Sequence, residues 1–342
     1  QGGEARPLRG GLPAARPGAR GPRMAEGLPP CSCGRVAGPG GLPSCSRFER
    51  WVRCASVEAI AQRGRYEQLL LAAQHNSPHL PADKERQLLL DVDRTCTQMG
   101  FFAEGSDGRR RLENVLRAWV VYDAEEAAAT AAAESRARLG PGVTAAPVGY
   151  VQGMNFIATA LLWHAARDEA AFWLFVAMLQ HYGLRCMFEV DMRGLRVRGF
   201  TVAQLLQQRM PELSEHLAEY LRNDLSLLLT EWLLTLFASS VPLGPVASLW
   251  DRFFEEGYVA IYRLALARLR CLQPWLRAET DFASLVHLIK EAHVEFDCSS
   301  GEPQPLLPAG EVQKGSDLAA VARSKKNGLI TKRFRPPVER LG

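Results

Sequence analysis

The sequence lacks the short motifs of several large enzyme classes. It contains no G-x-x-x-x-G-K-[ST] phosphate-binding loop, no H-E-x-x-H zinc motif and no G-x-S-x-G nucleophile turn. Its seven His do not cluster, and no two of its eight Cys have the C-x2-C spacing of a zinc site. We therefore expect this chain to bind no metal ion, and a metal-dependent or serine hydrolase has little support.

Long hydrophobic runs and strand patterns are also scarce. The longest apolar run, 225–243, is interrupted by Thr230, Glu231 and Pro242, whereas a membrane-spanning helix needs about 20 mostly apolar residues. The run therefore predicts a buried core helix. Several Cys fall within apolar helical stretches, where a free thiol packs as a small hydrophobe. This pattern favours a reducing, cytoplasmic compartment and no disulfide framework.

Positive charge is concentrated at the two ends of the chain. Residues 1–40 carry six Arg and two Glu, and residues 311–342 carry eight Lys or Arg against three acidic residues, whereas the part between them is net acidic. An acidic body argues against a nucleic-acid-binding face. The Gly- and Pro-rich segment 1–40 and the basic tail 298–342 are predicted to be disordered or flexible. The basic tails are also candidates for peripheral contact with acidic endomembrane lipids.

What the sequence does contain, from Arg47 onward, is apolar residues at helical spacing. The helical segments predicted from this spacing and from turn residues are 48–55, 66–73, 88–92, 112–122, 155–166, 168–179, 202–208, 225–238, 245–254, 258–272 and 282–296, with a further helix starting at Pro211. No run of Val, Ile and Thr between turn residues indicates a strand. We therefore expect an all-α domain. The Ala-rich segment 124–146 has almost no large apolar residue, and we interpret it as an insertion that leaves the core.

Two short strings differ from the rest of the helical pattern. They are Leu88-Leu89-Leu90-Asp91-Val92-Asp93-Arg94-Thr95 and Gly149-Tyr150-Val151-Gln152-Gly153-Met154-Asn155. Asp91 precedes Arg94 by three residues, so on a helix both lie on one face and can pair. Gly149 and Gly153 bracket Gln152, and glycine permits unusual backbone angles and the close approach of another chain. We therefore expect Gln152 to lie in a contact loop that opens a helix.

These strings resemble the TBC domain of Rab GTPase-activating proteins, which carries I-x-x-D-x-x-R followed by Y-x-Q-G-M-N. The matching residues are Leu88, Asp91 and Arg94, then Tyr150, Gln152, Gly153, Met154 and Asn155. Further ordered matches are Gly41-Leu42-Pro43 with Arg47 and Trp51, the stretch 231–237 that contains Trp232, Leu249-Trp250-Asp251, and Arg263. The resemblance covers residues 41–297 and implies a two-lobed, all-α domain flanked by disordered tails.

The resemblance implies that this chain stimulates GTP hydrolysis by a GTP-bound, Rab-type small GTPase and so regulates vesicle traffic. Arg94 and Gln152 are the implied catalytic fingers, supplied in trans. Asp91, Tyr150 and Gly149 would support them, together with Gly153. GTP and Mg²⁺ would belong to the partner, and the chain would have no cofactor of its own.

The other motif residues have structural interpretations. Trp232 and Trp250 are predicted to be core residues, because large aromatic side chains bury the most apolar surface. Asp251 and Arg263 are predicted to form a buried or half-buried ion pair.

Three positions depart from the family pattern. Cys96 and Thr97 follow Arg94 and Thr95 where the family commonly has an aromatic residue and Pro, and Ser248 lies where the family often has Arg. These departures keep two alternatives open. One is a non-catalytic scaffold that binds a GTPase, and the other is a helical adaptor with no connection to GTPases.

Overall fold

The computed structural model describes residues 35–37, 43–74, 77–136, 146–221, 225–291, 294–296 and 303–305. The α-helices are α1 (Ser46–Cys54), α2 (Arg65–Ala72), α3 (Ala82–Asp93), α4 (Asp107–Arg136), α5 (Met154–Leu162), α6 (Asp168–His181), α7 (Arg185–Phe188), α8 (Arg193–Arg209), α9 (Pro211–Leu221), α10 (Ser226–Leu234), α11 (Leu243–Glu256), α12 (Tyr258–Ala278) and α13 (Phe282–Glu291). Two 3-10 turns, η2 (Val57–Ala59) and η3 (Gly100–Phe102), lie between them.

Short strands, which the sequence did not indicate, form two antiparallel pairs. Strand β1 (Arg35–Ala37) pairs with β2 (Pro43–Cys45), and β3 (Val294–Phe296) pairs with β4 (Pro303–Pro305). The helix predicted over 282–296 therefore ends earlier, at Glu291. Apart from these strands, the tails 1–40 and 298–342 lie outside the described residues.

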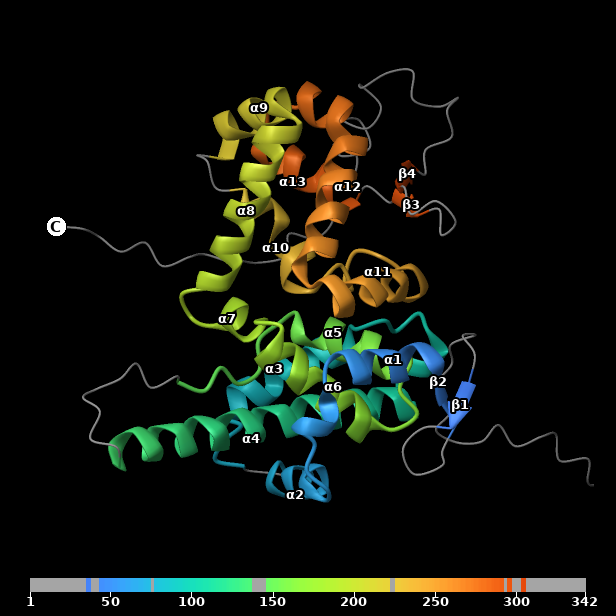
Figure 1. Cartoon of the computed structure of the whole chain (residues 1–342), viewed down its shortest axis with the longest axis vertical. Helices are drawn as coiled ribbons and strands as arrows, with labels where there is room; N and C mark the ends of the chain where they lie inside the picture. The colour runs from blue at the N-terminus through green and yellow to red at the C-terminus, as the bar shows by residue number, and fades with distance from the viewer. Residues whose placement is uncertain are drawn as a thin grey trace, which may run out of the picture.

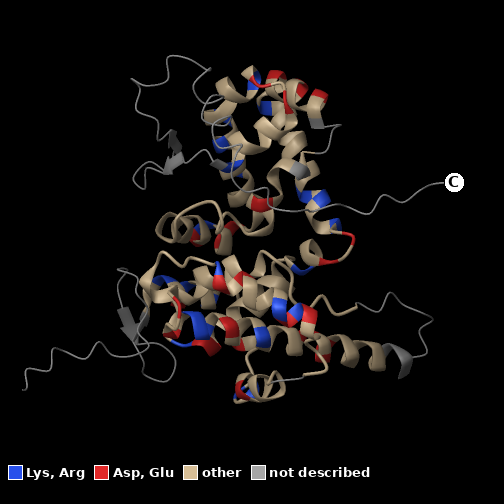
Figure 2. Ribbon diagram, turned by 180° about the vertical axis from the view of Figure 1, so that it is seen from behind, with Lys and Arg blue, Asp and Glu red and all other residues tan. Residues whose placement is uncertain are grey.

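The helices form two groups stacked along the long axis of the molecule (Figure 1). The lower lobe contains α1 to α6, and α4 packs there against α2, α3, α5 and α6. The upper lobe contains α8, α9, α10, α12 and α13, and α7 and α11 lie at the junction. The prediction of an all-α, two-lobed fold is confirmed. Acidic and basic residues are interleaved along the ribbon of both lobes (Figure 2).

Helix α4 is the longest of the lower lobe and runs through the centre of it. Leu112, Val115, Leu116 and Trp119 lie on one helical face and are buried. The helix does not end at residue 122 as predicted, because residues 124–136 of the Ala-rich segment continue it. Ala, Glu and Arg are good helix formers, and short Ala side chains bury little. Residues 137–145 lie outside the described part of the chain.

Aromatic side chains fill the core, and the predicted core residues Trp232 and Trp250 are both buried. Trp250 donates its Nε1–H to the Leu236 carbonyl oxygen at 3.0 Å. The ring of Trp232 stacks on Phe237, with 5.2 Å between the ring centroids. Buried indole N–H groups need such partners, and this one satisfies Trp250 on α11, at the junction of the lobes.

The predicted ion pair between Asp251 and Arg263 is wrong. Asp251 Oδ2 lies 2.9 Å from Arg47 Nε, and its Oδ1 lies 2.5 Å from Arg50 Nη2. Arg263 pairs with Glu256 instead. The physical reason is the packing of α1 against α11, which brings two arginines from the start of the domain to Asp251.

The cysteines are not all free, contrary to the expectation from the sequence. Cys54, Cys96 and Cys186 carry thiols, but Cys45 is disulfide-bonded, which the sequence analysis did not anticipate. Across the described ranges, no helix has both the length and the apolar character needed to cross a bilayer.

Candidate functional site

Arg94 lies at the C-terminal end of α3, where it is the C-cap residue. Leu88 and Val92 fix this helix by burying their side chains in the core. The Arg94 side chain is 61% exposed, so the guanidinium stands at the surface on a helix that is itself held firmly. Arg94 is therefore accessible from outside the molecule while its helix is anchored in the core.

Asp91 joins the two strings that the sequence analysis singled out. Its carboxylate is buried, with Oδ1 2.5 Å from Arg94 Nη2, so the ion pair expected from the spacing is present. Its Oδ2 accepts a hydrogen bond from the Tyr150 hydroxyl at 2.8 Å. Burial, together with the charge of Asp91, raises the pKa of Tyr150 well above its ordinary value. Tyr150 therefore keeps its proton and remains a donor.

A second bridge connects the same segments. The Asn155 side-chain amide donates to Thr95 Oγ1 at 2.7 Å, and Asn155 Oδ1 accepts from the Gly153 backbone N–H at 2.9 Å. The Thr95 hydroxyl in turn donates to the Asp91 carbonyl oxygen. Asn155 was predicted only as a motif residue, and the structure shows that it ties the loop around Gln152 to the end of α3.

Gln152 lies in the loop that leads into α5 and is exposed. The residue two positions later, Met154, begins α5 and is fully buried. Gly153 has a φ of +111°, and a Cβ added there would meet Leu234 Cδ2 at 3.2 Å. Glycine suits this position because it tolerates a positive φ and has no Cβ to crowd Leu234. The glycine therefore lets the chain turn from the exposed Gln152 directly into the core.

Sequence reasoning missed the residues that hold the loop before Gln152. Asp123 Oδ2 accepts hydrogen bonds from the backbone N–H groups of Val148 at 2.5 Å and Gly149 at 2.9 Å. Trp119 donates its Nε1–H to the Gly149 carbonyl oxygen at 2.9 Å. A signal was present, because Asp123 follows Trp119 by four residues and so falls on the buried face of α4. A carboxylate on such a face needs partners.

The three departures from the family pattern have defined places. Cys96 has a φ of +49°, and burial raises the pKa of its thiol. Thr97 is exposed in the turn that follows. Ser248 Oγ lies 3.5 Å from Arg47 Nη2, so an arginine from α1 lies beside the position where the family often has its own.

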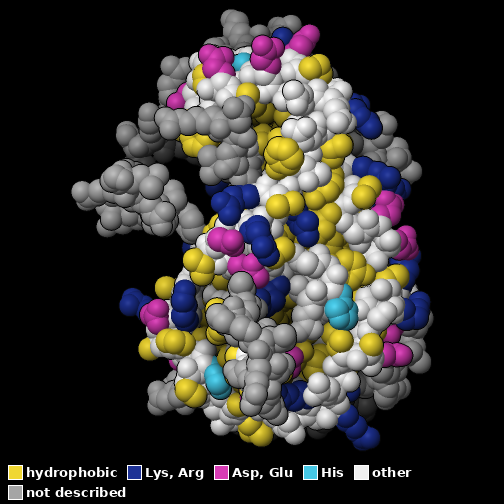
Figure 3. Space-filling view, turned by 60° about the vertical axis from the view of Figure 1, so that its left-hand side comes forward, with side chains coloured by type: hydrophobic (Ala, Val, Ile, Leu, Met, Phe, Trp, Pro, Cys, Tyr) yellow, Lys and Arg dark blue, Asp and Glu magenta, His cyan; other side chains and the backbone are white. Residues whose placement is uncertain are grey.

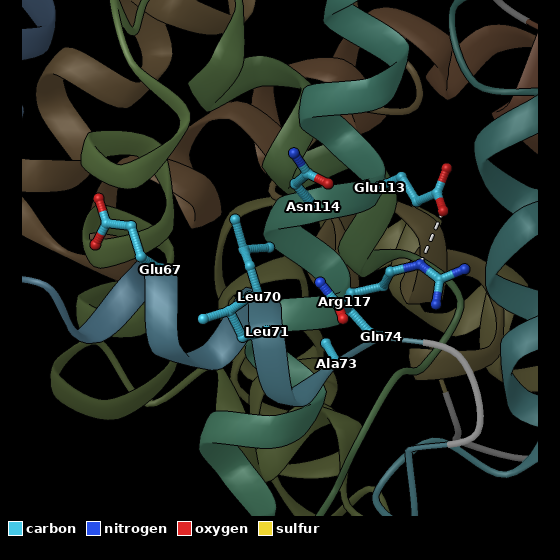
Figure 4. Close-up of a pocket in the computed structure, with 8 residues that line it drawn as sticks. All are labelled: Glu67, Leu70, Leu71, Ala73, Gln74, Glu113, Asn114 and Arg117. Atoms are coloured by element: carbon cyan, nitrogen blue, oxygen red, sulfur yellow. Dashed lines mark hydrogen bonds and ion pairs between the residues drawn. The ribbon is translucent and has the colours of Figure 1, made fainter.

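The described residues contain no group of three or more His, Cys, Asp or Glu side chains that could hold a metal ion. A groove of about 660 Å³ lies between α2 and α4 (Figure 4). It is lined by Glu67, Leu70, Leu71, Ala73, Gln74, Glu113, Asn114 and Arg117. None of the predicted site residues lines this groove, so it is separate from the Arg94 and Gln152 surface.

Apolar side chains are exposed on α8. Val197 is 55% exposed and Phe200 is 65% exposed, three residues apart on one helical face. Figure 3 brings the side of α7 and α8 forward, with hydrophobic side chains over the upper lobe and a group of basic and acidic side chains near the junction. Contiguous exposed apolar surface is typical of protein contact sites.

The family model of the Rab-GTPase-TBC domain matches residues 143–276. Over these residues the chain is similar to the TBC domain family. The matched residues include Gln152, Trp232, Trp250 and Asp251. Arg94 lies upstream of the match, so its assignment depends on the string around it and on its contacts with Asp91.

Curated relatives include the Rab GTPase-activating protein tbc-11 of Caenorhabditis elegans, which is 28% identical over 230 residues. That alignment covers 67% of this chain and 22% of the nematode protein. The Ecotropic viral integration site 5 protein homolog of Homo sapiens is 27% identical over 301 residues, which are 87% of this chain and 33% of the human protein. The chain therefore spans about a quarter to a third of the length of these relatives.

Two solved structures share the fold. The crystal structure of the Chlamydomonas flagellar RabGAP TBC domain has a TM-score of 0.53 and 24% identity, and the match covers 71% of this chain and 72% of that one. The Ypt/Rab-GAP domain of Gyp1p has a TM-score of 0.51 and 16% identity, covering 83% and 87%. Both comparisons place the two-lobed helical architecture within the TBC fold.

Proposed function

We propose that this TBC domain stimulates GTP hydrolysis by a Rab-type small GTPase in its GTP-bound state, with Arg94 and Gln152 inserted into the partner's nucleotide site. The observation that carries the proposal is the bridge through Asp91, which joins Arg94 to the loop of Gln152 through Tyr150. Two exposed polar groups from distant segments are thereby held on one rigid frame. Relatives named as Rab GTPase-activating proteins support the same activity.

Arg94 would stabilise the negative charge that develops on the transferring phosphoryl group. In phosphoryl transfer, positioning and electrostatic stabilisation supply almost all of the catalysis, and an arginine provided in trans is worth about 10³–10⁵ in rate. A guanidinium has five N–H donors. The contact of Nη2 with Asp91 therefore leaves donors for phosphate oxygens.

Gln152 would orient the attacking water. A side-chain amide both accepts and donates hydrogen bonds and does not titrate, so it can hold a water molecule in line at any physiological pH. Its exposed position at the start of α5 suits insertion into the partner. GTP and Mg²⁺ would both be contributed by the GTPase.

The exposed apolar face of α8 with Val197 and Phe200 offers contact area for a partner docked at the junction of the lobes. The consequence in the cell would be the inactivation of a Rab and the regulation of vesicle traffic. The basic tails 1–40 and 298–342 would add peripheral contact with endomembranes on the cytoplasmic side, because clustered Lys and Arg are attracted to anionic lipid headgroups.

The alternative is a scaffold that binds a GTPase without accelerating it. The turn after Arg94 favours this reading, since Cys96 with its positive φ stands where the family commonly has an aromatic residue. An altered turn could leave Arg94 out of reach of the phosphate.

The decisive experiment is single-turnover GTP hydrolysis across a panel of GTP-loaded Rab proteins, with the wild-type chain, Arg94→Ala and Gln152→Ala. We expect acceleration of at least one Rab and a loss of about 10³-fold or more for Arg94→Ala. Two matched controls should keep full activity. Arg86→Ala changes an exposed arginine of the same helix, α3, and Gln74→Ala changes an exposed glutamine of the lower lobe. Binding of a GTP-locked Rab without acceleration would establish the scaffold, and no binding at all would favour an unrelated adaptor.

A further inference from the structure

Asp123 is a buried carboxylate in the middle of α4. Its Oδ2 accepts from the Val148 and Gly149 N–H groups, and its Oδ1 accepts from Arg185 Nε at 3.1 Å. Three donors thus satisfy one buried charge. A buried carboxylate is costly unless it is paired and hydrogen-bonded, so this site has been built around Asp123.

Three side chains, Asp123, Trp119 and Arg185, form what we call the loop clamp. Together they hold four backbone groups of the loop before Gln152. Asp123 holds two N–H groups, Trp119 holds the Gly149 carbonyl oxygen, and Arg185 Nη2 donates to the Ala146 carbonyl oxygen at 2.9 Å. Gly149 takes a φ of +63° there. Residues 146–149 of the loop are therefore held from two sides, by side chains of α4 and by Arg185 of α7.

The path of the chain gives the clamp its importance. After Asp123 the chain continues along α4 to Arg136, and the described loop then resumes at Ala146 and returns to the same carboxylate at Val148. Twenty-four residues, 124–147, thus separate two points that lie within hydrogen-bond distance. Without the clamp, the backbone at Val148 and Gly149 would be attached to α4 only through this long segment.

We propose that Asp123 is a positioning residue for Gln152. The proposal rests on the proposed function and assigns to Asp123 the task of fixing Gly149, three residues before Gln152. Tyr150, the next residue, is fixed independently by Asp91. Holding both residues leaves little freedom for the finger that follows. A displacement of about 1 Å in a catalytic group, caused by a change outside the reacting centre, can cost about 10²-fold in rate.

The test measures GTP hydrolysis at increasing concentrations of the chain, which separates the maximal rate constant from the half-saturating concentration. For Asp123→Ala, we expect the maximal rate constant to fall about 10-fold or more, with the half-saturating concentration changed less than about twofold. Asp123→Asn retains a side-chain oxygen for the two backbone N–H groups and should recover most of the rate. Asp107→Ala removes a carboxylate of the same helix that is exposed and paired with Arg110, and should have no effect.

A second comparison separates positioning from a general structural role. In the Gln152→Ala background, Asp123→Ala should change the rate less than about twofold, because residues that act through one another are not additive. An equal loss in both backgrounds would overturn the proposal while the proposed function stands. A wild-type chain that accelerates no Rab would overturn both. If circular dichroism shows that Asp123→Ala does not fold, Trp119→Phe carries the same comparison, because it removes the donor to Gly149 while keeping an aromatic ring in the core.

Discussion

Asp91→Ala is expected to lower both the stability of the domain and its activity, whereas Arg94→Ala should lower chiefly the activity. The difference follows from burial. The Asp91 side chain is 3% exposed and joins Arg94 to Tyr150, but the Arg94 side chain is 61% exposed. Removing the buried member of this group therefore leaves other buried atoms without partners.

The magnitude follows from the contacts that are lost. The buried Tyr150 hydroxyl would lose its acceptor, and a buried unsatisfied polar group costs about 1–3 kcal/mol. The ion pair with Arg94 contributes at most about 1 kcal/mol, because exposure weakens such pairs. The free energy of unfolding should therefore fall by about 2–3 kcal/mol for Asp91→Ala. Asp91→Asn retains one acceptor and should cost about 1 kcal/mol.

Urea unfolding followed by tryptophan fluorescence measures this difference directly, and single-turnover hydrolysis on the same preparations measures the activity. Arg94→Ala should unfold within about 1 kcal/mol of the wild type. If Asp91→Ala were as stable as Arg94→Ala, or if it retained the wild-type rate, the bridge through Asp91 would not be what organises the site.

Two further predictions concern other parts of the fold. Burial, assisted by the positive charge of Arg47, lowers the pKa of His164 to about 4, while the unfolded chain takes up this proton near pH 6.5. The stability that neutral His164 provides is therefore complete above pH 6.5 and is lost as the pH falls towards 4. The free energy of unfolding should drop by about 2 kcal/mol between pH 7.5 and 5. Urea unfolding of His164→Gln should lack this component, and a variant with the same pH dependence as the wild type would contradict the assignment to His164. Gly153→Ala should lower the stability by about 1–3 kcal/mol, because φ is positive there and the added Cβ would crowd Leu234. Thermal unfolding measures this loss. As a control, Gly244→Ala should be neutral or slightly stabilising, because its Cβ would point into open space on α11.

The sequence predicted those helices whose buried face carries large apolar side chains. It predicted the start of α9 at Pro211, and α12 and α4 are recognisable from their periodicity. The sequence pattern predicted α8 only over 202–208, although the helix begins at Arg193. Its first turn packs so closely on α7 that a Cβ at Gly194 would lie 2.4 Å from Cys186 Sγ. Because a glycine is buried there in place of a large apolar residue, the apolar periodicity that marks a helix is missing.

The site was predictable to the extent that its contacts are local. The pair of Asp91 and Arg94 follows from the helical spacing alone. The bond from Tyr150 to Asp91 and the bonds of Asp123 to the loop before Gln152 join segments that are distant in sequence, and no local spacing encodes them. The same limit explains the error at Asp251, whose partners come from α1.

The loop clamp also affects how freely the domain can change in length. Because the chain continues from Asp123 along the rest of α4 and then returns to the same carboxylate at Val148 and Gly149, residues added or removed within 124–147 need not move Gln152. This segment is thus a natural insertion point, where descendants of one ancestral domain could diverge without altering the reaction. For the same reason, it is a suitable place to introduce a fluorescent reporter or an affinity handle while preserving the geometry around Gln152.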